Sequence, residues 1–258
     1  MVIRIALVVI LMVIGTPLFA AGGFTWSHLL LGFLEEPLIK NGIDPLPVLD
    51  MLFVVVGLII FAYFGGKPFR STEMVEPSGK ANFSHFIEVL VGGIYKFLSG
   101  IIQHGTGARP LFPLLGTYAL FILCMNLLGL VPGFNPPTDQ FNVTLPFALI
   151  IFVVTHYLGV KTHGSHYIKQ FLGPLWWLAP LMLPIELISH LVRPMSLSIR
   201  LFGNMTGDHK VVGVFTGLLP IILPIPFMGL GILVSVLQAF VFVLLSAIYF
   251  ESAMGEAH

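Results

Sequence analysis

Charged residues are scarce in this chain. Lysine, arginine, aspartate and glutamate make up only 9% of its 258 residues, whereas 57% are hydrophobic. A soluble domain carries far more charge on its surface, so this composition predicts an integral membrane protein. The formal net charge is zero, which gives no support for a nucleic-acid-binding surface.

Cysteine is nearly absent as well. Cys124 stands alone in an apolar run, so the sequence contains neither a disulfide framework nor a thiolate metal site. No glycine-rich phosphate loop is found, and we expect no cofactor and no bound nucleotide. His156, His163 and His166 lack a carboxylate or cysteine companion, and we interpret them as a solvated loop face and not as a metal site.

Long apolar runs are what the sequence has instead. Several approach the roughly 20 residues that a helix needs to cross a membrane, and they lack the short alternation of barrel strands. We predict an all-α polytopic membrane protein with about five transmembrane helices, an amphipathic helix in the membrane, and long tilted helices in the C-terminal half. The expected elements are spans over 46–64, 110–130 and 142–160, an amphipathic helix over 83–103, the helix of Arg200, and a stretch over 211–250 that forms a hairpin or one span broken near Pro220, Pro224 and Pro226.

The N-terminal residues 1–45 are expected to form a segment separate from the membrane domain over 46–258. Arg4 precedes an apolar run, and small residues follow at 20–23, as in a signal peptide. A cleaved signal and a retained segment both fit this pattern. Residues 24–45 are mixed in polarity and suit an interfacial stretch on the exported side.

The distribution of positive charge predicts the orientation. Two loops carry lysine or arginine, at Lys67, Arg70 and Lys80 and at Lys161 and Lys169, whereas the turn over 133–139 carries none. Cytoplasmic loops are enriched in these residues. We therefore expect the N-terminus on the exported side and the C-terminus in the cytoplasm.

Polar residues recur along one side of the apolar stretch over 174–208. With about 100° of turn per residue, Asn204 and Ser196 lie about 40° on either side of Arg200, and Glu186 falls within about 40° of it. Arginine at the centre of a membrane helix costs about 2.5–3.5 kcal/mol on insertion scales. Such a stripe is typical of a helix that lines a water-filled or protein-buried path.

Arg200 keeps its proton in a protein, so it is a fixed positive charge and a poor proton relay. A carboxylate on a partner is what it would attract. For Asn126, a hydrogen bond to a neighbouring helix and direct ion handling both remain open. We interpret Arg193 as reaching the cytoplasmic interface and His190 as a hydrogen-bond donor within the bundle.

The twelve residues over 194–205, Pro-Met-Ser-Leu-Ser-Ile-Arg-Leu-Phe-Gly-Asn-Met, closely resemble the signature of subunit a of bacterial F-type ATP synthases. The resemblance extends, in the family's order, over roughly residues 45 to 252. The other matching segments are 125–132, 142–145, 184–186 and 237–242.

This resemblance implies the non-catalytic stator of a rotary ion motor in the cell inner membrane. Its partners would be the ring of c subunits, the b-subunit peripheral stalk, lipid and protons. Two offset half-channels would carry ions to and from carboxylates on the ring. Arg200 would match the essential arginine that holds the ionised ring carboxylate and blocks a direct leak.

The resemblance also assigns roles to other positions. Gln238 is similar to the glutamine that faces the arginine, and Asn204 and Glu186 to residues that line the half-channels. His209 stands where some members have a glutamate and mitochondrial ones a histidine, and both a proton relay of the outer half-channel and a loop histidine fit it. Nine residues place it about 180° from Arg200, so it would be reached around the helix or after a break at Gly203 or Gly207.

Gly231 departs from the family pattern. The position seven residues before Gln238 often carries a histidine or glutamate in the family. Either His209 carries protons through the outer half-channel with water alone, or another group such as Asp208 compensates for the side chain that Gly231 lacks.

Two other functions remain open. A transporter or channel that works alone would use the polar stripe to bind an anion, although such proteins usually show repeated halves. The same subunit could also be driven by sodium, because the ion is selected mainly on the partner ring. We favour the proton.

Overall fold

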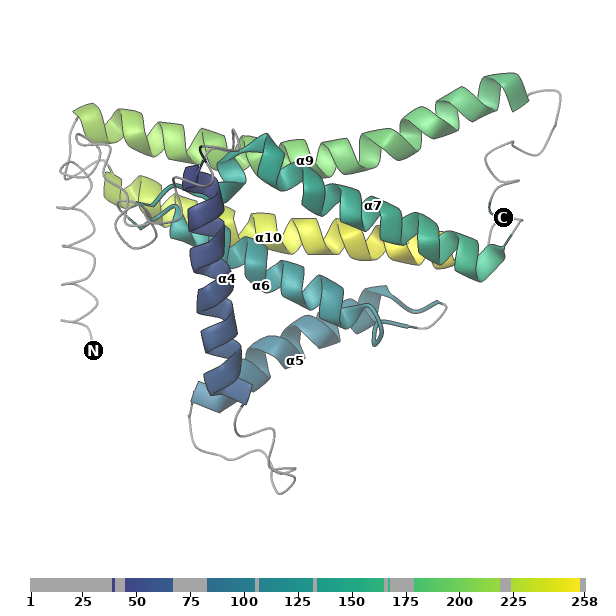
Figure 1. The fold of residues 1–258 in the computed structure, drawn as a ribbon, viewed down its shortest axis with the longest axis horizontal. Helices are drawn as coiled ribbons and strands as arrows, with labels where there is room; N and C mark the ends of the chain where they lie inside the picture. Colours follow the sequence, from purple (N-terminus) through teal and green to yellow (C-terminus); the bar gives the residue numbers. More distant parts are fainter. Residues whose placement is uncertain are drawn as a thin grey trace. The chain divides into compact units, whose positions relative to one another are not determined.

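The computed structural model describes residues 39, 45–66, 83–104, 107–131, 134–164, 167, 179–218 and 224–255. In this part of the chain all regular structure is helical, as predicted, and strands are absent. The elements in Figure 1 are α4 (Pro45–Gly66), α5 (Phe83–Ile101), α6 (Phe112–Leu128), the 3-10 helix η3 (Pro137–Asp139), α7 (Phe141–His163), α9 (Ala179–Leu218) and α10 (Pro224–Met254). The predicted signal peptide and the lysines and arginines at 67, 70, 80 and 169 lie outside the described residues.

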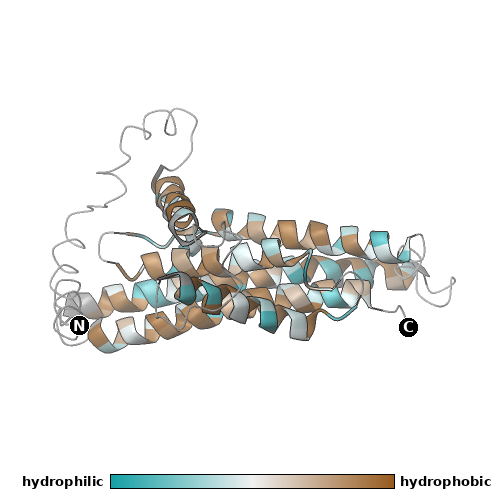
Figure 2. Ribbon diagram, turned by 90° about the horizontal axis from the view of Figure 1, so that it is seen from below, coloured by the Kyte–Doolittle hydropathy of each residue, from teal (hydrophilic) through white to brown (hydrophobic). Residues whose placement is uncertain are grey.

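Three of the described helices have the length and polarity of membrane spans. Among the described residues, three are long and apolar enough to cross a bilayer: α4, α7 and α10. The apolar helix α6 is shorter, with 17 residues, or about 26 Å against a hydrocarbon core of about 30 Å. Figure 2 shows hydrophobic residues over most of the helical ribbon, interrupted by isolated polar positions.

The helix α9 has 40 residues, which gives a length of about 60 Å. This is about twice the thickness of the hydrocarbon core, so the whole of α9 fits within a membrane only at a steep tilt. It continues through Gly203 and Gly207, and no break exposes His209. The predicted start of a new element at Val211 is wrong, because residues 211–218 belong to the helix of Arg200.

The last helix, α10, is a single helix of 31 residues. Pro224 and Pro226 stand in its first turn. Backbone N–H groups in a first turn have no partner within the helix, so proline is tolerated there. These prolines therefore begin the helix and do not break it.

The chain forms two compact units. The first comprises Met1–Phe61, Leu120–Val143 and Leu201–Ala239, and the second comprises Ala62–Ala119, Thr144–Arg200 and Phe240–His258. The side chains of Leu49, Ile122, Met125, Leu201 and Met205 are buried in the first unit, and those of Leu98, Leu115, Ile151, Leu197, Phe242 and Phe250 in the second. Each unit thus has its own apolar core.

In the second unit, α7 packs against the N-terminal part of α9. Thr144 and Ser198 share a buried hydrogen bond of 2.9 Å between their hydroxyls. Further along α7, the ring of His156 lies 5.2 Å from that of His190, measured between centroids. Sequence numbers rise along one helix as they fall along the other, so the two helices run in opposite directions.

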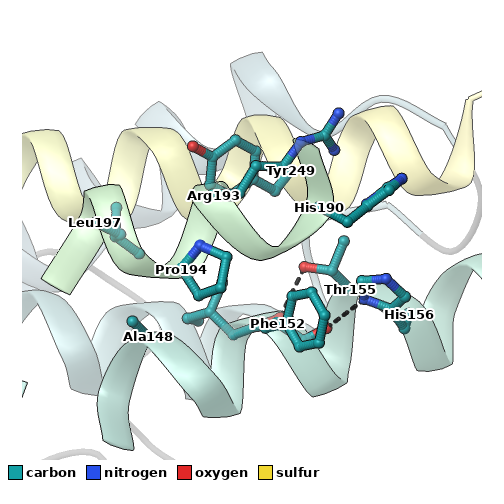
Figure 3. Close-up of a pocket in the computed structure, with 10 residues that line it drawn as sticks. Ala148, Phe152, Thr155, His156, His190, Arg193, Pro194, Leu197 and Tyr249 are labelled. Carbon is teal, nitrogen blue, oxygen red and sulfur yellow. Dashed lines mark hydrogen bonds between the residues drawn. The ribbon is translucent and has the colours of Figure 1, made fainter. Parts of the chain in front are cut away.

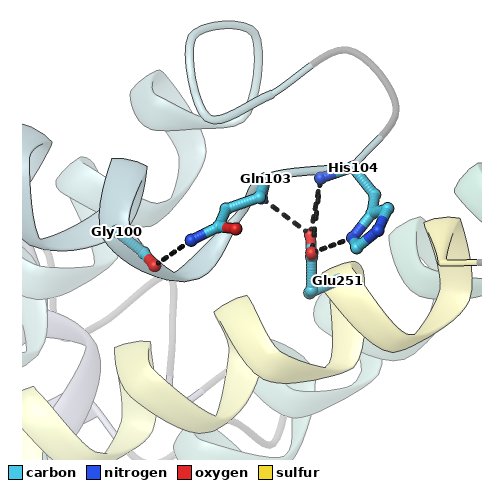
Figure 4. A network of polar contacts seen from close by, with 4 residues as sticks. All are labelled: Gly100, Gln103, His104 and Glu251. Atoms are coloured by element: carbon cyan, nitrogen blue, oxygen red, sulfur yellow. Dashed lines mark hydrogen bonds and ion pairs between the residues drawn. The ribbon is translucent and has the colours of Figure 1, made fainter.

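Also in the second unit, the carboxylate of Glu251 near the end of α10 fixes the chain that follows α5. It accepts hydrogen bonds from the backbone N–H of Gln103 at 3.0 Å and of His104 at 3.2 Å. The Nδ1 atom of His104 contacts the same carboxylate (Figure 4). Charge-assisted bonds of this kind are about twice as strong as neutral ones.

In the first unit, Asn126 links α6 to two other elements. Its Oδ1 atom accepts a hydrogen bond of 2.8 Å from the hydroxyl of Thr138 in η3, and its Nδ2 atom donates one of 3.4 Å to the backbone oxygen of Ser235 in α10. The side chain is buried. The interhelical bond expected of this residue is present, whereas its use in ion handling stays a prediction.

We predict that Gly129→Ala destabilises the protein. A Cβ atom at residue 129 would lie 2.6 Å from Cβ of Pro136, whose ring is tied to the backbone and cannot swing away. Overpacking typically costs about 1–3 kcal/mol. The measurement is the thermal unfolding midpoint of the detergent-solubilised complex.

Gly57→Ala is the matched control for this substitution. A Cβ atom at residue 57 would meet nothing within 4 Å, and alanine favours a helix over glycine by about 1 kcal/mol. The midpoint of this variant should equal or exceed that of the unsubstituted protein. Equal midpoints for the two alanine variants would contradict the close packing at Gly129.

Candidate functional site

Arg200 stands near the middle of α9, and its residue is exposed on the surface of the chain. No residue in the described ranges forms a hydrogen bond or ion pair with it. Ser196 and Asn204 lie about 40° on either side of it around the helix, whereas the exposed apolar residues Met195 and Ile199 lie about 140° and 100° away. A permanent cation in a membrane helix is costly without a counter-charge. The arrangement thus calls for a negative group from outside the described part of this chain.

Asn204 and Gln238 form a polar link between α9 and α10 in the first unit. The Nδ2 atom of Asn204 donates a hydrogen bond of 2.6 Å to Oε1 of Gln238, whose residue is only 3% exposed. The Nε2 atom of Gln238 is buried and has no hydrogen-bond partner among the described residues. An unsatisfied buried donor costs about 1–3 kcal/mol. Water or a partner group is therefore expected at this amide.

Asp139 in η3 lies beside the C-terminal part of α9. Its backbone oxygen accepts a hydrogen bond of 3.2 Å from the hydroxyl of Thr206. Burial raises the pKa of the Asp139 carboxyl, and the charges of His209 and Lys210 oppose that rise. The three side chains are therefore close enough to influence one another's charge.

Asp208 occupies the space beside Gly231. A Cβ atom at residue 231 would lie 2.6 Å from Oδ2 of Asp208 and 2.7 Å from a methyl carbon of Leu130. Glycine is therefore the residue that leaves room for this carboxylate. A carboxylate from α9 thus lies where a side chain at residue 231 of α10 would extend, and its compensation for that missing side chain stays a prediction.

A second polar cluster lies in the second unit, on the part of α9 that precedes Arg200. The Nε2 atom of His190 is 3.2 Å from Oε1 of Glu186, and their side chains are 12% and 41% exposed. The guanidinium carbon of Arg193 lies 5.7 Å from the ring centroid of Tyr249. Figure 3 shows His190 on α9 and His156 on α7 at the same small pocket, with Arg193 beside them.

Sequence reasoning missed this cluster. We expected His156 to lie on a solvated loop, and this prediction is wrong. His156 lies within α7, is partly buried, and packs against His190. The four-residue spacing of Glu186 and His190 was the available signal, since such residues are neighbours on a helix.

Ser196 lies partly buried one turn before Arg200.

Comparison with known proteins adds to this geometry. The profile of the ATP synthase A chain family matches residues 49–251. The chain belongs to this family. ATP synthase subunit a of Geobacter sulfurreducens is 47% identical over 205 residues, which cover 80% of this chain and 86% of that protein. The subunit a of Citrifermentans bemidjiense is 46% identical over 234 residues, which cover 90% and 98%, and that of Geotalea daltonii is 51% identical over 205 residues, which cover 80% and 86%.

Family membership and the apolar helices together identify a multi-pass membrane protein and a component of the ATP synthase complex. The match begins within α4 and ends near the end of α10. It therefore contains both polar clusters as well as Arg200.

We predict that Asp139→Asn changes how stability depends on pH. A raised carboxyl pKa means that the folded state binds the proton more tightly than the unfolded state. The resulting stabilisation is full below the ordinary pKa of 3.8 and is lost as the pH rises through the folded-state pKa. Asparagine cannot titrate, so the variant should gain stability relative to the unsubstituted protein as the pH rises from about 4 to neutrality.

The measurement is the thermal midpoint of the solubilised complex over that pH range, for both proteins. The difference between the two midpoints should move steadily in favour of the variant. A difference between the two midpoints that stays constant with pH would contradict the raised pKa of Asp139.

Proposed function

We propose that this chain is the stator subunit of the membrane rotary motor of an F-type ATP synthase. It would provide two offset half-channels that pass protons to and from carboxylates on the c-subunit ring. The observation that carries the proposal is the exposed guanidinium of Arg200, which has no ion-pair partner among the described residues and stands on a largely apolar helix. A ring that presents carboxylates at the same depth in the membrane supplies the missing counter-charge.

Arg200 acts as a gate because its charge is permanent. It attracts an ionised ring carboxylate, and it repels a proton that would pass directly between the half-channels. One elementary charge that crosses 100 mV releases about 2.3 kcal/mol. A leak would dissipate this free energy without turning the ring.

The polar clusters on either side of Arg200 along α9 correspond to the two half-channels. Asp208, with His209 and Asp139 nearby, belongs to the outer one, because the η3 turn has no positive charge and is expected on the exported side. Glu186 belongs to the inner one. The buried amide of Gln238, joined to Asn204, provides a hydrogen-bond donor for water or for the ring.

This assignment gives the chain no part in ATP chemistry itself. ATP would be made or hydrolysed elsewhere in the complex, and this subunit would convert proton flow into rotation. The b-subunit stalk would hold it still against the ring. We place it in the cell inner membrane, with the N-terminus on the exported side and the C-terminus in the cytoplasm.

We predict that Arg200→Ala abolishes coupled proton transport while the complex still assembles. ATP-driven acidification of inverted membrane vesicles should fall at least about 100-fold, equivalent to about 2.7 kcal/mol. Arg200→Lys should be nearly as damaging, because an ammonium lacks the planar fork of a guanidinium and shifts its pKa readily.

Arg109→Ala is the matched control, because Arg109 is also exposed but lies in the turn before α6. Acidification by this variant should equal that of the unsubstituted complex. Normal pumping by Arg200→Ala, with the subunit present in the membrane, would refute the assignment.

We predict that the transported ion is the proton. ATP hydrolysis and synthesis by the purified complex in liposomes should then be independent of sodium at fixed pH. The measurement is both rates across a sodium titration, with potassium used to hold the ionic strength constant. A rate that rises and saturates with sodium would show a sodium-driven motor and would leave the stator role intact.

A further inference from the structure

The pair of histidines on facing helices in the second unit is not used by the gate described above. His190 contacts Glu186 through Nε2, and the rings of His190 and His156 lie 5.2 Å apart, between α9 and α7 (Figure 3). We propose that His190 relays protons between the part of α9 near Arg200 and the carboxylate of Glu186. We also propose that His156 keeps this relay from holding more than one extra proton at a time. This inference rests on the proposed function, since it assigns residues to its inner half-channel.

The order of these groups along α9 suits a path that leads outward from Arg200. His190 precedes Arg200 by ten residues and Glu186 precedes it by fourteen, which places them about 15 and 21 Å from it along the helix axis. The side chain of His190 is 12% exposed and that of Glu186 is 41% exposed. Exposure at the surface of the chain therefore increases from the histidine to the carboxylate.

The contact between the two side chains defines one proton transfer. An ionised Glu186 can only accept a hydrogen bond, so Nε2 of His190 carries the hydrogen. A proton that arrives from the side of Arg200 binds Nδ1 and forms an imidazolium. The proton on Nε2 then passes to Oε1 of Glu186, which leaves a neutral carboxylic acid and a neutral ring protonated on Nδ1.

Release of the proton from Glu186 to water restores the carboxylate. Rotation of the His190 ring then brings its N–H back to Glu186. Each cycle moves one proton, and no other reactant is consumed. A histidine suits this role because its unperturbed pKa of about 6.5 lies near physiological pH.

The surrounding charges limit the relay to one proton at a time. The groups that act on His190 are Glu186 and Arg193 on α9 and His156 on α7. Nδ1 of His156 donates a hydrogen bond of 2.9 Å to the backbone oxygen of Phe152, so an added proton on this ring would go to Nε2. Two imidazolium rings this close to each other and to a guanidinium repel, which opposes a second positive charge in the cluster.

The test replaces His190 with glutamine in the complete complex. Glutamine keeps an amide donor for Glu186 but cannot exchange protons near neutral pH. In inverted vesicles, whose outer face is cytoplasmic, we expect ATP synthesis to fall about tenfold and to lose its dependence on external pH between about 6 and 8. Added imidazole should restore a large part of the rate, because it can carry protons in place of the side chain.

His85→Gln is the matched control. His85 also lies near a carboxylate on its own helix, with Nδ1 3.7 Å from Oε2 of Glu88 in α5, and these side chains are 44% and 49% exposed. We expect its rate and pH profile to equal those of the unsubstituted complex. His190→Asn, whose shorter side chain also has an amide, is tested in parallel, and subunit content is measured for every variant.

The outcomes separate the relay from the gate. An unchanged rate and pH profile in His190→Gln, or a lowered rate that imidazole does not restore, would overturn the relay and leave the stator function standing, provided that Arg200→Ala is inactive. Normal pumping by Arg200→Ala would refute the stator function itself. Imidazole rescue in both His190 variants, with none in His85→Gln, would establish the relay.

Discussion

The rest of the structure depends on one electrostatic constraint, a guanidinium held at membrane depth without a counter-charge from the described part of its own chain. Arg200 cannot escape its charge by releasing a proton, as a lysine or glutamate could. A carboxylate that approached from a neighbouring subunit would lower the free energy of holding this charge in a membrane. The proposed binding to a rotor and the proposed role as a gate both rest on this one charge.

Polar side-chain bonds join the helices within each unit. In the first unit, Asn126 joins α6, η3 and α10, and Asn204 joins α9 to Gln238. In the second unit, Thr144 and Ser198 join α7 to α9. Lipid gives little hydrophobic drive for helices to associate, so such bonds contribute to specific pairing in a membrane. Residues proposed to line a half-channel and residues that join the helices are thus close together in sequence.

Much of the fold could be predicted from the sequence, because long apolar runs and buried charges leave few alternatives in a bilayer. The helix of Arg200 and the amphipathic α5 were recognised in this way. The end of α9 was not, because Asp208, His209 and Lys210 interrupt the apolar pattern directly before Val211 and suggest a boundary that the helix does not have. The packing of His156 on His190 and of Asp208 on Gly231 joins residues far apart in sequence, which helical periodicity along one segment does not reveal.

Glu251 has a mechanical consequence for the end of the chain. Its carboxylate holds two successive backbone N–H groups beyond α5, so α10 cannot twist about its long axis without breaking these bonds or dragging α5 with it. A twisting force on α10 would thereby be shared with a second helix. The brace thus couples the end of α10 mechanically to the segment that follows α5.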